Sequence, residues 1–152
     1  MDDKPSIPVG LHCILELYDC PSDLLDDVAR VREAMRAAAQ RAGSTLLNEV
    51  CHRFEPQGVT ALALLAESHI SIHTWPELGY AAVDVFTCGE TADPVQACQH
   101  LVQALKATHH HLSTIQRNSP AETILQCPAT PSEMATPNPL QESATPSAAT
   151  HR

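Results

Sequence analysis

Residues 67–89 read ESHISIHTWPELGYAAVDVFTCG, and this pattern predicts an antiparallel β-hairpin. Two runs rich in Ile, Val, Thr and aromatic residues, at 69–75 and 80–88, flank the tetrapeptide Pro76-Glu77-Leu78-Gly79. Such runs favour strands, whereas proline and glycine between them indicate a turn. An antiparallel sheet is therefore the starting point for the fold.

Two further apolar runs precede this hairpin, at 44–54 and 58–66, and Glu55-Pro56-Gln57 separates them. Together with the hairpin they predict a four-stranded antiparallel meander. Within the second run, residues 61–66 do not alternate polar with apolar side chains, so we expect both faces of that strand to be buried.

Helical patterns flank the meander on both sides. Apolar residues recur at helical spacing after Ser22, which we expect to cap the helix, and Gly43 supplies a left-handed stop. A second helix is expected to begin at Asp93-Pro94 and to end near Lys106. Two strands complete the pattern, at 11–18 and 109–116.

The predicted fold class is α+β, a two-layer sandwich in which two helices cover one face of an antiparallel sheet. The other face also needs cover, because the run at 61–66 has no polar side. We therefore expect the chain to dimerise into a larger sandwich.

Composition excludes several classes of partner. The formal net charge is −9, with only 9 Lys and Arg in 152 residues, which argues against nucleic acid. The chain begins without a basic, then apolar, leader and has no run long enough to span a membrane, so we expect a cytoplasmic protein with no membrane partner. Its six cysteines form no Cys-x-x-Cys pair and are expected to be free thiols.

The last part of the chain differs from the rest. Residues 118–152 hold six of the twelve prolines and many Ser, Thr and Ala, with almost no aliphatic periodicity. We interpret 1–117 as one domain and 118–152 as a disordered tail.

Chemically active groups gather in the quoted stretch, where a serine, an imidazole, a carboxylate and a thiol lie within 21 residues at Ser68, His73, Glu77 and Cys88. This stretch closely resembles the self-processing segment of prokaryotic S-adenosylmethionine decarboxylases, and a weaker resemblance extends from about Gly10 to about Gln116.

The resemblance implies an enzyme that cuts its own backbone between Glu67 and Ser68, giving chains 1–67 and 68–152. Ser68 would become a pyruvoyl group whose carbonyl forms an imine with S-adenosylmethionine, and neither pyridoxal phosphate nor a metal would be needed. His73 would accept a proton during processing, and Cys88 would donate one after carbon dioxide leaves. An imidazole exchanges protons near neutral pH, and a thiol is mostly protonated there, so both residue types suit these roles.

Further residues match by position. The resemblance implies that Phe54 stacks on adenine, that Glu77 binds the ribose hydroxyls and that Thr60 supports processing, in place of the serine usual in relatives. Leu11 occupies a position where relatives often carry a basic residue. The product would be decarboxylated S-adenosylmethionine, the aminopropyl donor for spermidine.

Strand geometry allows an independent prediction. With the expected turns, Ser68 lies opposite Thr87 and beside Cys88, whereas Thr60 lies opposite His73 and next to Phe54. These two clusters would be five residues apart, or about 16 Å at ~3.3 Å per residue. We therefore expect a homodimer whose two active sites each take one cluster from each subunit.

Alternatives remain at this stage. A pyruvoyl-dependent arginine or ornithine decarboxylase would use the same chemistry, although Phe54 and Glu77 favour the nucleoside substrate. A regulatory paralogue that never processes itself would carry the fold without activity. A metal site at His109-His110-His111 is disfavoured, because adjacent residues in a strand point to opposite faces.

Overall fold

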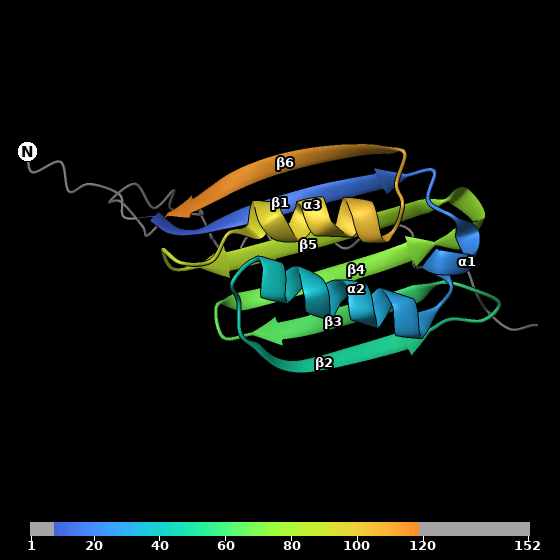
Figure 1. Ribbon diagram of the computed structural model, residues 1–152, viewed down its shortest axis with the longest axis horizontal. Helices are drawn as coiled ribbons and strands as arrows, with labels where there is room; N and C mark the ends of the chain where they lie inside the picture. Colours follow the sequence, from blue (N-terminus) through green and yellow to red (C-terminus); the bar gives the residue numbers. More distant parts are fainter. Residues whose placement is uncertain (1–7, 119–152) are drawn as a thin grey trace, which may run out of the picture. The chain divides into compact units, whose positions relative to one another are not determined.

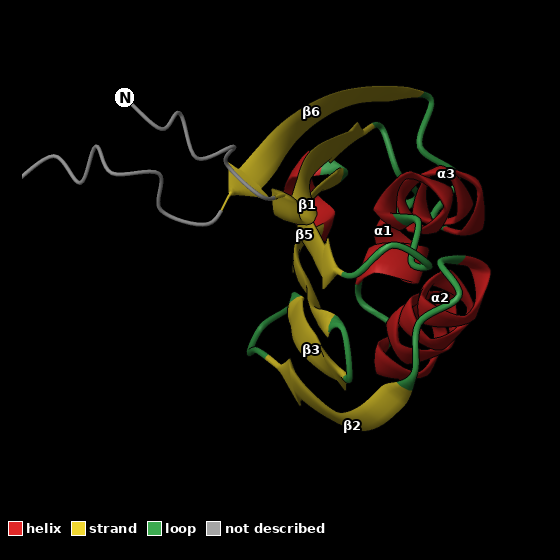
Figure 2. Cartoon of the chain, turned by 90° about the vertical axis from the view of Figure 1, so that its left-hand side faces the viewer, coloured by secondary structure: helices red, strands yellow, loops and turns green. Residues whose placement is uncertain are grey.

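The computed structural model describes residues 8–118, which form one antiparallel sheet with helices on one side (Figures 1 and 2). The strands are β1 (Pro8–Tyr18), β2 (Leu46–Arg53), β3 (Val59–Leu65), β4 (Ser68–Trp75), β5 (Tyr80–Cys88) and β6 (His109–Asn118). The helices are α1 (Ser22–Leu25), α2 (Val28–Arg41), α3 (Pro94–Ala104) and the 3₁₀ turn η1 (Pro76–Leu78). The predicted α+β class is confirmed.

The strand order is β2-β3-β4-β5-β1-β6, and every neighbouring pair is antiparallel. The first four strands in this order follow one another along the chain, which confirms the predicted meander. The first strand of the sequence then lies between β5 and β6 at the other side of the sheet (Figure 1).

The core fills the space between the sheet and the helices. Alternate strand residues such as Leu15, Ile70 and Val85 point to this side and are fully buried. Val31 of α2 and Leu101 of α3 meet them from the helical layer and are buried as well. Each of these side chains contributes about 1.5–3 kcal/mol by leaving water, so this layer supplies the main driving force for folding.

The prediction of a single helix after Ser22 is wrong, because the structure has two helices there. Ser22 begins the short helix α1 without capping it, and the chain bends at Asp26. Asp27 then caps α2 by accepting hydrogen bonds from the N–H groups of Ala29 and Arg30. An aspartate cap outweighs continuous apolar spacing here, since it satisfies backbone donors that begin a new helix. The predicted stop at Gly43 is confirmed by its φ of 70°.

Other boundaries shift by a few residues. β1 begins at Pro8 instead of position 11, and β6 continues to Asn118, one residue beyond the predicted domain boundary. The second helix begins at Pro94 under an Asp93 cap, as predicted, and ends at Ala104. The predicted tail, including Cys127, lies outside the described residues.

Within residues 8–118, no second layer covers the sheet face opposite the helices. Leu62 and Leu64 of β3 are 44% and 54% exposed there, and the expectation that a dimer buries this face stays a prediction. The strand lacks alternation because its outer residues are also apolar, not because a second layer of this chain covers them.

The five cysteines in the described range are all free thiols. Within that same range, no helix is long and apolar enough to cross a membrane.

Candidate active site

The peptide bond between Glu67 and Ser68 lies where the chain turns from β3 into β4. The Glu67 carbonyl oxygen accepts a hydrogen bond from the backbone N–H of Cys88, at 2.9 Å, and another from its thiol, at 2.6 Å. The Glu67 carboxylate accepts a third from the N–H of Thr45, at 2.9 Å. Three contacts therefore hold the residue before the serine.

The sheet register explains why Cys88 reaches this carbonyl. Ser68 pairs with Thr87 across β4 and β5, as the sequence predicted, so the next residue of β5 lies beside Glu67. On its other side β5 pairs with β1, where Gly10 lies opposite Cys88. The first predicted cluster, Ser68 with Cys88, is therefore assembled in one protomer.

Ser68 has an unusual backbone and a specific side-chain contact. Its φ is 156°, whereas a regular antiparallel strand has a φ near about −140°. The Ser68 hydroxyl lies 3.2 Å from Nδ1 of His69, the next residue. No role for His69 is predicted from the sequence, since neighbouring strand residues normally point to opposite faces.

The second predicted cluster lies farther along β4. Thr60 pairs with His73 as predicted, and the Thr60 hydroxyl lies 2.8 Å from Nδ1 of the imidazole. Phe54 is 48% exposed and packs edge-on against His52, with ring centroids 4.7 Å apart. Its predicted register is wrong by one residue: the Phe54 N–H donates to the carbonyl of Gly58, because the turn takes three residues instead of four.

Glu77 completes this cluster from η1. It is exposed, and its carboxylate accepts a hydrogen bond from the side-chain amide of Gln57 in the β2–β3 turn, at 3.2 Å. Trp75, whose ring centroid lies 6.4 Å from that of His73, extends the cluster toward Tyr80. Phe54, Trp75 and Glu77 are therefore all exposed at this end of the sheet.

One protomer does not join the two clusters. Ser68 and His73 are five residues apart on the same strand β4, which corresponds to about 16 Å at ~3.3 Å per residue. The residue in contact with the Ser68 hydroxyl is instead His69.

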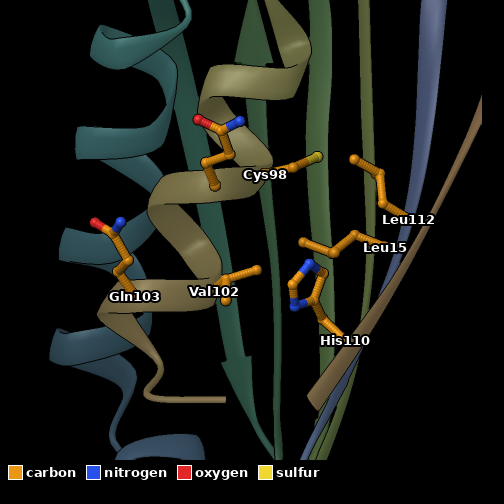
Figure 3. A pocket seen from close by; sticks show the side chains of 7 residues that line it. Leu15, Cys98, Val102, Gln103, His110 and Leu112 are labelled. Carbon is orange, nitrogen blue, oxygen red and sulfur yellow. The ribbon is translucent and has the colours of Figure 1, made fainter. Parts of the chain in front are cut away.

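The histidines elsewhere in the described chain do not form a metal site. In residues 8–118 no group of three metal-ligating side chains converges. His109 pairs with Asp19, while His111 lies 3.1 Å from the hydroxyl of Ser113. His110 faces a pocket of about 230 Å³ between α3 and the strands β1 and β6 (Figure 3). That pocket is mainly apolar and contains none of the predicted site residues.

Comparison with known proteins identifies the family of this chain. The family model described as S-adenosylmethionine decarboxylase matches residues 11–118. An S-adenosylmethionine decarboxylase proenzyme of Synechococcus sp. (strain WH7803) is 66% identical over 113 residues, which cover 74% of this chain and 88% of that protein. The proenzyme of Moorella thermoacetica is 49% identical over 110 residues, covering 72% and 87%.

A solved structure gives the same result. The crystal structure of the adenosylmethionine decarboxylase from Aquifex aeolicus aligns with a TM-score of 0.70 and 36% sequence identity. The alignment covers 76% of this chain and 96% of the other. Sequence and fold together establish that this chain belongs to the S-adenosylmethionine decarboxylase family.

Proposed function

We propose that this chain is a self-processing decarboxylase that converts S-adenosylmethionine to decarboxylated S-adenosylmethionine and carbon dioxide. The observation that carries the processing part is the Glu67 carbonyl, which accepts two hydrogen bonds from Cys88 directly before Ser68. Donors aimed at a carbonyl oxygen stabilise the negative charge that develops when a nucleophile attacks its carbon. The contacts of Glu67 and Cys88 therefore fit the conversion of Ser68 to a pyruvoyl group.

Processing begins with the Ser68 hydroxyl, which attacks the carbonyl carbon of Glu67 and exchanges the amide for an ester. Proximity favours this step, since nucleophile and carbonyl belong to adjacent residues. A base then removes the α-proton of Ser68, and the ester leaves by β-elimination to give a dehydroalanine. This tautomerises to an imine, which water hydrolyses with release of ammonia, giving a pyruvoyl group at a new amino terminus. We assign the removal of the Ser68 α-proton to His73, whose ring is oriented by the contact between its Nδ1 and the Thr60 hydroxyl.

When formed, the pyruvoyl group would supply an electron-accepting carbonyl in place of pyridoxal phosphate. Cys88 would then hold the proton that is delivered to the substrate carbon after carbon dioxide departs. Its hydrogen bond to the Glu67 carbonyl, directly before Ser68, supports this role. Phe54 would stack on adenine and Glu77 would bind the ribose hydroxyls. No metal is assigned a role.

Because Phe54, Glu77 and His73 lie at the far end of β4 from Ser68, we propose that a homodimer supplies them from the partner subunit. The product would serve as aminopropyl donor for spermidine synthesis in the cytoplasm. The sheet and helices of residues 8–118 would carry this activity.

The intact mass of the purified protein tests this proposal. We expect two chains that separate between Glu67 and Ser68, with the second lighter by one ammonia than a chain that begins with serine. A Ser68→Ala variant should remain whole. The cut protein should release carbon dioxide from S-adenosylmethionine and not from arginine or ornithine. A chain that stays uncut on long incubation would overturn the proposal and favour a regulatory paralogue.

A further inference from the structure

We propose that His69 is a catalytic residue of self-processing and acts within its own protomer as the base for the first step, the attack of Ser68 on Glu67. This inference rests on the proposed function, since it concerns the cleavage that the function requires. Its basis is the contact of 3.2 Å between the Ser68 hydroxyl and His69 Nδ1. His73 is about 16 Å farther along the strand, at ~3.3 Å per residue, and cannot reach this hydroxyl in the same protomer.

The surroundings of His69 hold its ring in place. His69 pairs with Phe86 across β4 and β5, and Phe86 pairs with His12 across β5 and β1. The His69 ring meets both edge-on, with centroids 6.0 Å from Phe86 and 6.4 Å from His12. His12 in turn is fixed by Asp84, at 3.1 Å. A half-buried imidazole with packed neighbours on two strands keeps one orientation toward the serine.

The three groups that an acyl transfer needs are therefore adjacent: Ser68 as nucleophile, His69 as base and Cys88 as donor to the carbonyl oxygen. Such an arrangement activates a hydroxyl that is a weak nucleophile by itself. The two histidines therefore act in different steps. His69 contacts the Ser68 hydroxyl and serves the acyl shift, whereas His73 belongs to the other cluster and serves the later removal of the α-proton.

The step balances as an isomerisation. His69 Nδ1 takes the proton of the Ser68 hydroxyl while its oxygen bonds to the Glu67 carbonyl carbon, and the carbonyl oxygen carries the negative charge toward the Cys88 donors. The bond between that carbon and the Ser68 nitrogen then breaks, and the nitrogen takes the proton back from His69. The product is an ester with a free amino group at Ser68, formed without oxidant or reductant.

His69→Ala tests this assignment in the full chain. We expect its cleavage to slow by about 10²- to 10⁴-fold, the usual contribution of a positioned base. His69→Asn should be equally slow, because an amide oxygen can accept the serine hydrogen bond and cannot carry the proton. His111→Ala, which changes a histidine of β6, should cleave at the normal rate. Thermal unfolding of each variant checks that the fold is kept.

Hydroxylamine distinguishes the two steps, because it cleaves esters and leaves amides intact. Stalled His69→Ala should resist it, whereas stalled His73→Ala should be cut between Glu67 and Ser68. Co-expression with a Ser68→Ala chain should leave the His69→Ala chain uncut. In the mixed dimer the partner's His69 is intact, but it does not reach the Ser68 hydroxyl of the other subunit.

Four results would overturn the role of His69: near-normal cleavage of His69→Ala, recovery in His69→Asn, sensitivity of the stalled variant to hydroxylamine, or rescue by the Ser68→Ala partner. Each of them is read against a wild-type chain that cuts itself. Failure of the wild-type chain to cut would instead sink the proposed function, so the two failures are distinct.

Discussion

Cys88 contacts the carbonyl of the Glu67–Ser68 peptide bond, the bond that we propose is cut in self-processing. Its backbone N–H and thiol both donate to the Glu67 carbonyl, and this requires β5 to be held firmly at its last residue. Gly10 of β1 makes that possible. A Cβ atom added at Gly10 would lie 2.4 Å from the Thr87 oxygen and 3.1 Å from Cys88 Cα, so only glycine lets the strands approach this closely.

We predict that Gly10→Ala slows self-cleavage and lowers stability by about 1–3 kcal/mol, the usual cost of overpacking. The added methyl group must push β1 away from β5 or shift Cys88 from the Glu67 carbonyl. Thermal unfolding and the time course of intact mass measure the two effects. Val9→Ala, at a neighbouring exposed position, is the control. An unchanged cleavage rate in Gly10→Ala would mean that this close contact is unimportant for the site.

At the scale of elements, the β2–β3 hairpin that carries Phe54 is tied to the first helical segment. Asp26, between α1 and α2, accepts hydrogen bonds from Arg53 at 2.7 Å and from the N–H of Gly58 at 2.9 Å. The Gln57 side chain also bonds to Glu77. The two proposed substrate-binding residues are therefore held by one network.

We predict that Asp26→Asn raises the KM for S-adenosylmethionine by roughly two- to tenfold, the range of one lost hydrogen bond, with little change in self-cleavage. Asparagine can still accept from Gly58 and can no longer pair with Arg53. Asp23→Asn, which removes a carboxylate from α1, is the matched control. Equal KM values in both variants would show that the network does not position the hairpin.

The same network has a defined pH dependence. The Arg53 guanidinium first, and the Gly58 N–H second, hold the pKa of Asp26 below its ordinary value. A lowered pKa in the folded state means that the contribution to stability is present above the unfolded pKa and is lost as pH falls through the folded one. Asp26→Asn should flatten this part of the acid unfolding curve relative to Asp23→Asn.

At the scale of the whole molecule, the open sheet face and the divided site lead to the same expectation. Val50, Leu62 and Leu64 leave an apolar surface on β2 and β3 that one chain does not cover. Exposed apolar surface on a sheet favours association with a second layer. A two-fold dimer would cover it and would also bring the His73 cluster of one subunit to the Ser68 cluster of the other.

Mixed dimers test this arrangement. Ser68→Ala and His73→Ala chains carrying different tags are co-expressed and purified through both tags. We predict that the His73→Ala chain is cut in the mixture faster than alone, because the partner supplies an intact His73, while the Ser68→Ala chain stays whole. If the mixture processes no faster than His73→Ala by itself, the shared site is wrong.

Local sequence patterns were enough to predict the α+β class, the meander and most of its registers. Side chains in a strand repeat every two residues and turns of defined length set the pairing, so Ser68 opposite Thr87 and Thr60 opposite His73 followed from local rules. The break before α2 did not follow, since a cap at Asp27 overrides apolar spacing.

The contacts of the reactive side chains, in contrast, follow from the folded chain. The register at Phe54 depends on a turn that is tied to Asp26, a residue 28 positions earlier in the chain. The contact of Ser68 with His69 occurs where the φ of Ser68 is 156°, away from the value of a regular strand. Both arise because distant strands and helices hold the backbone in geometries that neighbouring residues do not specify.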